Sequence, residues 1–245
     1  MITKLSCVNI NNDTPAIKFL GVHLDPKLNF KYHIDKIHSK ISRSLYAINT
    51  AKHLIDKTAL KTLYNSLIHS HLNYCIPIWG SAPKSHLIKL ELQQKKAIRI
   101  ITNSNYNAHT VPLFKSLEIL PVTEQMKYSK LQLMHDYIQH RLPCSFDHIW
   151  IRNDQRAERQ LRNARSFDIP YIRLQSFMNF PLSDFPRLWN EIIIPNSNQN
   201  LIGNENITHT FTDNMRKKPF SKKLKKLLLE KLTLLCRRDD CVECN

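Results

Sequence analysis

Apolar residues recur every three or four positions over much of the first 140 residues, which is the period of an amphipathic α-helix. The clearest run begins near residue 30 and would bury one helix face, formed by Ile34, Ile37, Ile41, Leu45 and Ile48. Similar spacing returns in residues 56–71, 85–101 and 123–138. Because such helices bury their apolar faces against one another, the sequence predicts a mainly α-helical bundle over residues 30–143.

A strand-like pattern precedes this bundle. Residues 17–24 partly alternate apolar and polar side chains and then reach Asp25-Pro26, a turn signal. We therefore expect a short N-terminal β-hairpin within residues 1–29. At the start of the second helix, Asp56 is expected to be the N-cap, since its carboxylate can accept hydrogen bonds from free backbone amides.

The character of the chain changes after Pro143. Residues 144–195 carry spaced arginines and then a Pro- and Phe-rich stretch, which we expect to be irregular. Residues 196–214 include an asparagine-rich run typical of a linker. Residues 215–245 combine a basic helix with a cysteine-containing tail. The predicted order is thus hairpin, helical bundle, irregular segment, linker and basic C-terminal helix.

The charge balance indicates the kind of partner. The chain has 36 Lys plus Arg against 20 Asp plus Glu, a formal net charge of +16. Such an excess favours polyanions, with nucleic acid first and an anionic membrane surface second. Lys, Arg, His or Asn interrupts every apolar run before it reaches the ~18 residues of a membrane span, and the start lacks a secretory signal. We therefore expect an intracellular protein, nuclear or cytoplasmic, that does not act at a membrane.

No residue pattern in the chain is typical of a catalytic centre. Its three glycines are too widely spaced for a glycine-rich phosphate loop, which excludes a P-loop and a dinucleotide fingerprint. The adjacent carboxylates Asp239-Asp240 lie in a charged tail without a rigid strand to hold them, so we expect a solvated turn there rather than a metal site. We therefore predict no catalytic residue and no cofactor in this chain.

The cysteines of the tail leave two readings open. Cys236, Cys241 and Cys244 have the spacing C-x4-C-x2-C, which could supply three ligands to zinc. A closed tetrahedral site needs a fourth ligand, and the nearest upstream candidate is His209. The motif is either an incomplete zinc site or a set of three free thiols.

Two basic segments near the C-terminus are candidates for phosphate contacts. The predicted C-terminal helix has leucines on one face, which leaves the other face to its cations, among them Lys222, Lys225 and Lys226. This face could bind phosphates, be simply solvated, or lie on an anionic membrane. In the preceding segment arginines recur every three residues, at Arg156, Arg159 and Arg162. Guanidinium forks suit phosphates, although intrahelical ion pairs with neighbouring acids are the alternative.

Six short motifs follow one another along the chain. They are FLGVHLD at residues 19–25, LYNSLIHSHLNYC at 63–75 with WG at 79–80, LQQKKAIRII at 92–101, AHTVPLF at 108–114, PRLWN at 186–190 and FSKKLK at 220–225. In this order they resemble the segment that follows the catalytic palm in reverse transcriptases of non-LTR (LINE-type, jockey/CR1-like) retrotransposons. The resemblance extends from about residue 17 to residue 244.

This resemblance implies the C-terminal part of an RNA-directed DNA polymerase, which is a nucleotidyltransferase. A primer-grip-like hairpin would contain Phe19, Leu20 and Gly21. The helical bundle would be the thumb, which in this family packs against a template–primer duplex. Its outward-facing cations would then contact RNA or an RNA–DNA duplex; they are Lys36, Lys40, Arg43, Lys95, Lys96 and Arg99.

The family's aromatic-Ala-Asp-Asp motif precedes the region of resemblance and is not in this sequence. We therefore expect the chain alone to be inactive as a polymerase, with the divalent metal belonging to the missing palm and a palm-containing chain as a further partner. Apolar residues that would meet the palm, such as Phe19, Ile76 and Trp79, would lack a cover. The alternative is a retained accessory protein that binds nucleic acid without polymerising it.

Overall fold

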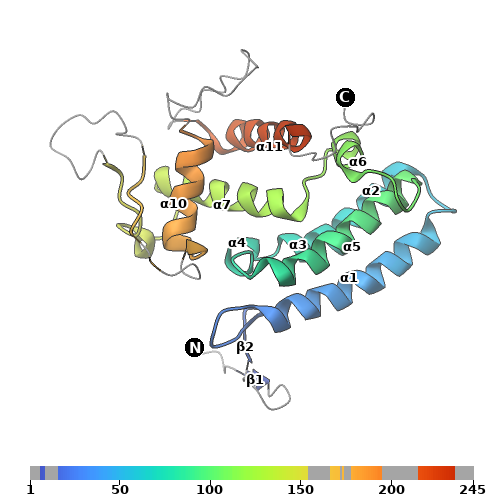
Figure 1. The fold of residues 1–245 in the computed structure, drawn as a ribbon, viewed down its shortest axis with the longest axis horizontal. Helices are drawn as coiled ribbons and strands as arrows, with labels where there is room; N and C mark the ends of the chain where they lie inside the picture. The colour runs from blue at the N-terminus through green and yellow to red at the C-terminus, as the bar shows by residue number, and fades with distance from the viewer. Residues whose placement is uncertain are drawn as a thin grey trace. The chain divides into compact units, whose positions relative to one another are not determined.

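The computed structural model describes residues 6–8, 16–153, 166–171, 173, 178–194 and 215–234 (Figure 1). It divides into two compact units. Unit 1 contains Met1–Met126 and Leu229–Asn245, and unit 2 contains Lys127–Leu228. The expected fold class is confirmed, because the chain is mostly helical and opens with an antiparallel hairpin followed by helices.

The sheet at the start of unit 1 has three strands in the order β1-β2-β3, formed by Ser6–Val8, Ala16–Phe19 and Val22–Leu24. β2 and β3 form the expected hairpin, with Phe19 opposite Val22. Strand β1 adds an antiparallel neighbour to β2 that the sequence analysis did not predict. Val22 of the hairpin is buried in the core, and the His23 amide donates a hydrogen bond to His33 Nδ1 on α1 at 3.4 Å.

The hairpin turn consists of Leu20 and Gly21, both with positive φ angles of 45° and 83°. A two-residue turn with both residues in this region matches the right-handed twist of the paired strands. A Cβ atom added at Gly21 would lie 3.5 Å from the Tyr74 ring, and the Tyr74 hydroxyl donates a hydrogen bond to the Leu20 carbonyl. The turn of the hairpin is therefore held against the helical part of unit 1.

Asp25 links the hairpin to the first helix. Its carboxylate accepts hydrogen bonds from the backbone amides of Asn29 and Phe30, at 3.0 and 2.8 Å. Phe30 adopts a left-handed conformation with φ of 53° and directly precedes α1, Lys31–Ala51. The last residue of the FLGVHLD motif thus closes the loop that leads into the longest helix.

The remaining helices of unit 1 are α2 (Lys57–Tyr64), the π-helical segment η1 (Asn65–His69), α3 (Ser70–Asn73), α4 (Ile76–Trp79), α5 (Lys84–Thr102) and α6 (Thr110–Leu117). Helices α1 and α5 pack side by side, as Figure 1 shows. As expected, the Asp56 carboxylate caps α2 by accepting a hydrogen bond from the Ala59 amide at 3.1 Å.

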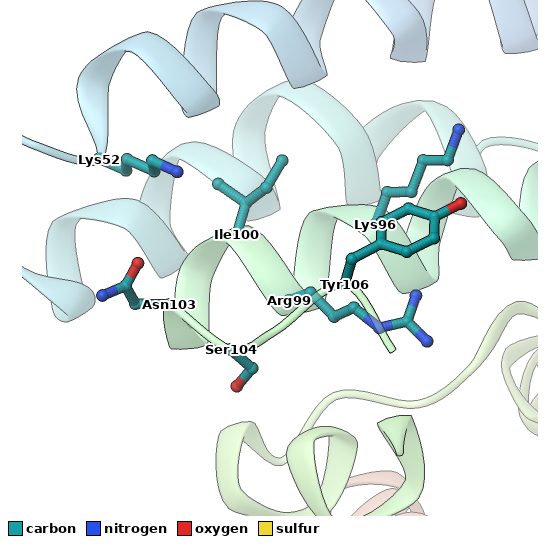
Figure 2. Close-up of a pocket in the computed structure, with 7 residues that line it drawn as sticks. All are labelled: Lys52, Lys96, Arg99, Ile100, Asn103, Ser104 and Tyr106. Atoms are coloured by element: carbon teal, nitrogen blue, oxygen red, sulfur yellow. The ribbon is translucent and has the colours of Figure 1, made fainter. Parts of the chain in front are cut away.

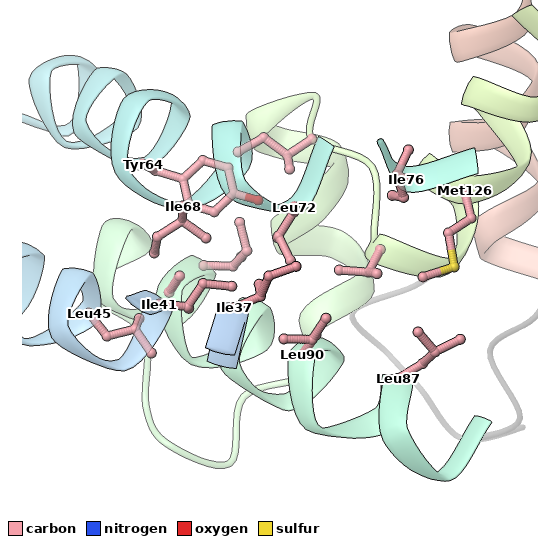
Figure 3. Close-up of a cluster of buried hydrophobic side chains, with 14 of the residues drawn as sticks. Ile37, Ile41, Leu45, Tyr64, Ile68, Leu72, Ile76, Leu87, Leu90 and Met126 are labelled. Atoms are coloured by element: carbon pink, nitrogen blue, oxygen red, sulfur yellow. The ribbon is translucent and has the colours of Figure 1, made fainter. Parts of the chain in front are cut away.

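The core of unit 1 is largely aliphatic. Figure 3 shows its side chains meeting from α1, η1, α3, α4 and α5. The five apolar residues predicted on α1 are all buried, and Ile34, Ile41 and Ile48 are completely inaccessible. The helical period seen in the sequence therefore identified the buried face of α1 correctly.

The WG pair at residues 79–80 has a structural role. Trp79 is completely buried and its indole N–H donates a 2.7 Å hydrogen bond to the Tyr74 carbonyl. A Cβ atom at Gly80 would lie 2.5 Å from the Ile76 carbonyl and 3.0 Å from Met126 Cγ, so a larger residue does not fit there. Of the residues expected to lack a cover, Ile76 and Trp79 are instead fully buried, whereas Phe19 is 48% exposed.

Unit 2 contains most of α7 (Val122–Ile138), the 3-10 turn η2 (Cys144–Phe146), α10 (Pro181–Ile192) and most of α11 (Lys217–Leu234). Helix α10 lies within the segment that was expected to be irregular. Its first residue is Pro181, at a position where no backbone N–H is needed, so the proline begins the helix instead of breaking it.

The interior of unit 2 is rich in aromatic rings. Trp150 stacks on Phe185, and Trp189 stacks on Phe220, with ring centroids 5.8 and 6.0 Å apart. Asn190 holds the backbone of Phe167 by two 2.9 Å hydrogen bonds, one donated and one accepted by its side-chain amide. The tryptophan and asparagine of the PRLWN motif therefore organise the interior of this unit.

Two further expectations concern membranes and the linker. Among the helices of the described residues, none combines the length and apolar character required to cross a bilayer. The asparagine-rich segment 196–214 and the cysteine-containing end of the tail lie outside the described residues. The five-part domain organisation given above stays a prediction.

Candidate nucleic-acid interface

The hairpin brings together a group of cations from different elements of unit 1. Lys18 on β2 lies directly opposite His23 on β3 in the strand register. His23 packs edge-on against Tyr32, with ring centroids 5.0 Å apart, and the Lys36 ammonium lies 5.2 Å from the centroid of the Tyr32 ring. We call Lys18, His23, Tyr32, Lys36 and Lys40 the hairpin cluster.

The electrostatics of histidines in this region show how concentrated the positive charge is. Burial and then the charges of Lys18, Lys36 and Lys40 lower the pKa of His23. Burial and Lys40 also lower the pKa of His71. Burial is the larger cause of both shifts, and the remainder is repulsion from nearby lysines, with Lys40 acting on both histidines.

Within the described part of the chain, no ion pair with a carboxylate involves Lys18, Lys36 or Lys40. Lys36, Lys40 and Arg43 are exposed and follow one another at four- and three-residue spacing on α1, so they project from one side of that helix. The predicted outward positions of these three residues are therefore present in the structure. Their charge is available to an external anion.

The predicted cations of α5 have different surroundings. Lys95 is partly buried and forms an ion pair with Glu91 at 2.7 Å, which neutralises it within its own helix. Lys96 is exposed, and Arg99 is partly buried with its Nε donating a 3.1 Å hydrogen bond to the Ala108 carbonyl. The three residues are thus not equivalent as candidates for phosphate contact.

Lys96 and Arg99 line a pocket of about 220 Å³ at the C-terminal end of α5, which we call the α5 pocket (Figure 2). Its other lining residues are Lys52, Ile100, Asn103, Ser104 and Tyr106. Lys52 reaches the pocket from the end of α1, as Figure 2 shows, and Tyr106 from the loop after α5. The Arg99 guanidinium carbon lies 6.0 Å from the centroid of the Tyr106 ring.

The remaining predicted residues lie elsewhere. Lys222 and Lys226 are exposed and Lys225 is partly buried on the part of α11 that belongs to unit 2, while Phe220, Leu224 and Leu228 are buried. Arg156, Arg159 and Arg162 lie outside the described residues, as do Cys236, Cys241 and Cys244. On the hairpin, Phe19, Leu20 and Gly21 are exposed, as their proposed contact with a primer requires.

Among the charged and aromatic residues of these sites, the sequence analysis missed Lys18, His23, Tyr32, Lys52 and Tyr106. Lys18 is in a strand too short to show a face, and Lys52 follows the last residue of its helix. Tyr106 had a weak signal, because it is an aromatic residue in a polar loop directly after a basic helix. Its position beside Arg99 depends on the path of the loop, which local sequence does not determine.

Comparisons with known proteins identify relatives for about half of the chain. It is 25% identical over 114 residues, 45% of its length, to the probable RNA-directed DNA polymerase from transposon X-element of Drosophila melanogaster. It is 28% identical over 116 residues, 46% of its length, to the RNA-directed DNA polymerase from mobile element jockey of the same species.

A third relative, the probable RNA-directed DNA polymerase from transposon BS of Drosophila melanogaster, is 28% identical over 141 residues, 53% of this chain. The aligned parts cover 13% to 16% of the length of these three relatives. No protein-family model matches the chain. No solved structure matches it either.

Proposed function

Because about half of this chain is homologous to the RNA-directed DNA polymerases of non-LTR retrotransposons, we propose that it is the thumb and post-polymerase part of such an enzyme. In this proposal it binds a template–primer duplex or RNA through its basic helices and does not itself catalyse nucleotide addition. The observation that carries the proposal is the hairpin cluster, in which lysines from two elements converge without carboxylate partners among the described residues.

The exposed hairpin turn is consistent with an origin beside a larger domain. Leu20 is 73% exposed and Phe19 is 48% exposed, although both are apolar. We propose that in the longer protein the duplex and a palm-containing chain cover this end of the hairpin. In the same proposal the palm supplies the carboxylates and the divalent metal ions required for nucleotide addition.

The proposal is tested by measuring the affinity for a fluorescent RNA–DNA hybrid over a range of salt concentrations. Each phosphate contact releases a counterion, so log Kd should rise linearly with the logarithm of the salt concentration. The slope is ~0.9 per contact for B-form DNA, and we expect a similar slope for the RNA–DNA hybrid. The double variant Lys36→Ala/Lys40→Ala removes two exposed cations four residues apart. It should weaken binding and reduce the slope by about 2.

A matched control is the double variant Lys57→Ala/Lys61→Ala on α2, which has the same change in net charge and the same spacing. It should leave the slope nearly unchanged. If both double variants weaken binding equally, the affinity reflects net charge alone, and the hairpin cluster is not the binding surface.

Polymerisation is tested separately with a primed template and either Mg²⁺ or Mn²⁺. The chain alone should add no nucleotide, since the sequence contains no aromatic-Ala-Asp-Asp motif to hold the metal ions. Clear primer extension by the purified chain would contradict the assignment to the thumb and post-polymerase part.

A further inference from the structure

The α5 pocket contains three cations and no carboxylate among its lining residues. In the described part of the chain, Lys52, Lys96 and Arg99 take part in no ion pair with an acid. Lys95, one position before Lys96, is neutralised by Glu91 and does not line the pocket. The pocket therefore holds an excess of positive charge that an anion would balance.

The pocket lies at the C-terminal ends of two helices, which offers another explanation for its cations. Lys52 is the C-cap of α1 and Asn103 is the C-cap of α5, and the partial negative charge at a helix C-terminus attracts cations. Here several of the final carbonyl groups are already hydrogen-bonded. On α5 the Ile98, Arg99 and Ile100 carbonyls accept from Thr102, Ser104 and Asn103, respectively.

The end of α1 is closed in the same way, because the Ile48 and Ala51 carbonyls accept hydrogen bonds from the amides of Lys52 and Leu54. Each helix end is equivalent to roughly half a negative charge. The two ends together therefore carry less charge than the three cationic side chains of the pocket. The net field in the pocket is therefore positive.

The Arg99 side chain is held in place before any ligand arrives. Its Nε donates to the Ala108 carbonyl, and the Ala108 amide donates to the Asn105 carbonyl at 3.0 Å, which closes the loop carrying Tyr106. These bonds use only one of the guanidinium donors, so the others can bind a ligand. A side chain fixed in this way loses less conformational entropy on binding.

Tyr106 adds a flat apolar surface at the edge of this charged pocket. Its side chain is 77% exposed, and its ring lies beside the Arg99 guanidinium (Figure 2). Proteins that bind single-stranded nucleic acid combine cations for the backbone with exposed aromatic rings for the bases. A paired base is not available for stacking on such a ring, because its faces are covered by its neighbours in the duplex.

We propose that the α5 pocket binds one nucleotide unit of single-stranded RNA or DNA. The phosphate lies between Lys52, Lys96 and Arg99, and the base stacks on Tyr106. A volume of about 220 Å³ accommodates the phosphate and part of the sugar and leaves the base outside on the ring. The proposal deepens the proposed function and rests on it, since it names the strand type bound at one of its basic sites.

The test measures the affinity for a fluorescent oligo(U) of about ten nucleotides, a length within the usual range of single-strand sites. Tyr106→Ala should weaken this binding at least about fivefold, which corresponds to the loss of one stacked base. Tyr106→Phe should bind as tightly as the unmodified chain, because it keeps the ring. Tyr46→Ala is the control, since Tyr46 is also 77% exposed and does not line the pocket.

The phosphate part of the proposal is tested with Lys96→Ala, for which Lys84→Ala near the start of α5 is the charge-matched control. Lys96→Ala should weaken oligo(U) binding several-fold and Lys84→Ala should not. If Lys96→Ala weakens binding but Tyr106→Ala does not, the pocket binds backbone phosphate without stacking a base, and the proposal is overturned. Equal effects of Tyr106→Ala and Tyr46→Ala, or of the two lysine variants, overturn it as well.

Binding of the RNA–DNA hybrid by the same variants separates this proposal from the broader one. Tyr106→Ala should leave hybrid binding unchanged, whereas Lys36→Ala/Lys40→Ala should weaken it. Hybrid binding that depends on the hairpin cluster, with no Tyr106-dependent binding of oligo(U), removes the pocket proposal alone. Tyr106-dependent binding of oligo(U) without hybrid binding removes the duplex function and retains the pocket.

Discussion

The two units of this chain are stabilised by different kinds of side chain. Unit 1 buries aliphatic residues at regular helical spacing, such as Ile34, Ile41 and Ile48 on α1. Unit 2 stacks aromatic rings from distant segments and buries a salt bridge between Lys130 and Asp184. The fold of unit 1 therefore follows from a repeating pattern in the sequence, and the fold of unit 2 depends on a few specific contacts.

The same difference sets how each unit should respond to mutation. An aliphatic core relaxes partly around a shortened side chain. A buried ion that loses its partner stays charged in an interior where water cannot solvate it. We therefore expect the largest single-residue effects in unit 2, and we expect unit 1 to be most sensitive at Gln94, which is 1% exposed and joined to three partners.

The largest effect is expected for Asp184→Ala. Lys130 Nζ lies 2.7 Å from Asp184 Oδ2, and both side chains are almost completely buried. Removing the carboxylate leaves an uncompensated ammonium in the interior, which should lower the free energy of unfolding by about 3 to 5 kcal/mol. Urea unfolding followed by tryptophan fluorescence measures the loss, and hydrogen exchange should place it in unit 2.

Arg187→Ala is the matched control, because Arg187 pairs with the other oxygen of Asp184 at 2.7 Å but is 48% exposed. Its loss should cost less than about 1 kcal/mol. The double variant Lys130→Met/Asp184→Leu should restore most of the stability lost by Asp184→Ala, since it removes both charges. If Asp184→Ala and Arg187→Ala cost the same, the proposed contrast between the units fails.

In unit 1 we expect the strongest effect for Gln94→Ala. The buried Gln94 side chain donates to the Tyr64 hydroxyl and the Leu120 carbonyl and accepts from the Val122 amide, all within 2.9 Å. Burial raises the pKa of Tyr64 to about 12, so its hydroxyl stays neutral and needs a partner. Loss of the amide should cost about 2 to 4 kcal/mol, measured by the same urea titration.

Gln93→Ala is the neighbouring control. Gln93 joins α5 to His38 and Ser42 on α1 through hydrogen bonds of 2.8 Å, which are only partly buried. Water can replace these bonds, so this variant should cost about 1 kcal/mol. Equal losses for the two glutamines would show that unit 1 depends on polar contacts in general and would weaken the comparison.

The helices of unit 1 could be predicted because a repeating apolar face is a local signal. The α10 helix of unit 2 could not, since Pro181 and Pro186 are typical helix breakers and Asp184 is not typical of a core. The role of Asp184 depends on Lys130, which reaches it from α7 through tertiary packing and also lies over the Phe185 ring. The motifs of the resemblance were visible, but their structural roles, such as the fit of Gly80 against Met126, were not.

The candidate site divides in the same manner. Lys36, Lys40 and Arg43 were predictable as exposed because their spacing places them on the side of α1 away from the core. Lys95 was predicted as a phosphate ligand together with Lys96, yet Glu91 one turn earlier pairs with it. The contribution of Lys52 and Tyr106 to one pocket depends on how α1 and α5 end, and no local pattern encodes it.

A smaller effect is expected from pH through His33 in unit 1. Burial, followed by the charges of His23 and Lys40, lowers the pKa of His33 from 6.5 to about 4. Below its ordinary pKa the unfolded chain binds a proton that the folded chain does not, so stability should fall as pH drops from about 6.5 towards 4. Between pH 7 and pH 5 the loss should be roughly 1 to 2 kcal/mol.

The measurement is the difference in unfolding free energy at pH 7 and pH 5 for the unmodified chain and for His33→Gln. The variant cannot take up the proton, so its stability should change less over this range. His135 in unit 2 also has a pKa lowered mainly by burial, and it provides an independent contribution of the same sign. If His33→Gln leaves the pH dependence unaltered, His33 has the same pKa in the folded and the unfolded chain.

The smallest effect is expected for Asp56→Ala, the change most easily foreseen from sequence. The carboxylate accepts from the Ala59 amide at the exposed start of α2, so its loss should cost about 1 kcal/mol. Asp56→Asn should retain most of the stability, because asparagine is an equally good N-cap, and urea unfolding distinguishes the two. The Asp56 cap is a local contact that the sequence predicts, and water can bond to the Ala59 amide when the carboxylate is removed. The ion pair of Asp184 with Lys130 is a buried tertiary contact that the sequence does not predict, and water cannot replace the lost carboxylate. If Asp56→Ala and Asp184→Ala lower the free energy of unfolding equally, a contact that the sequence predicts stabilises this fold as much as one that it does not predict.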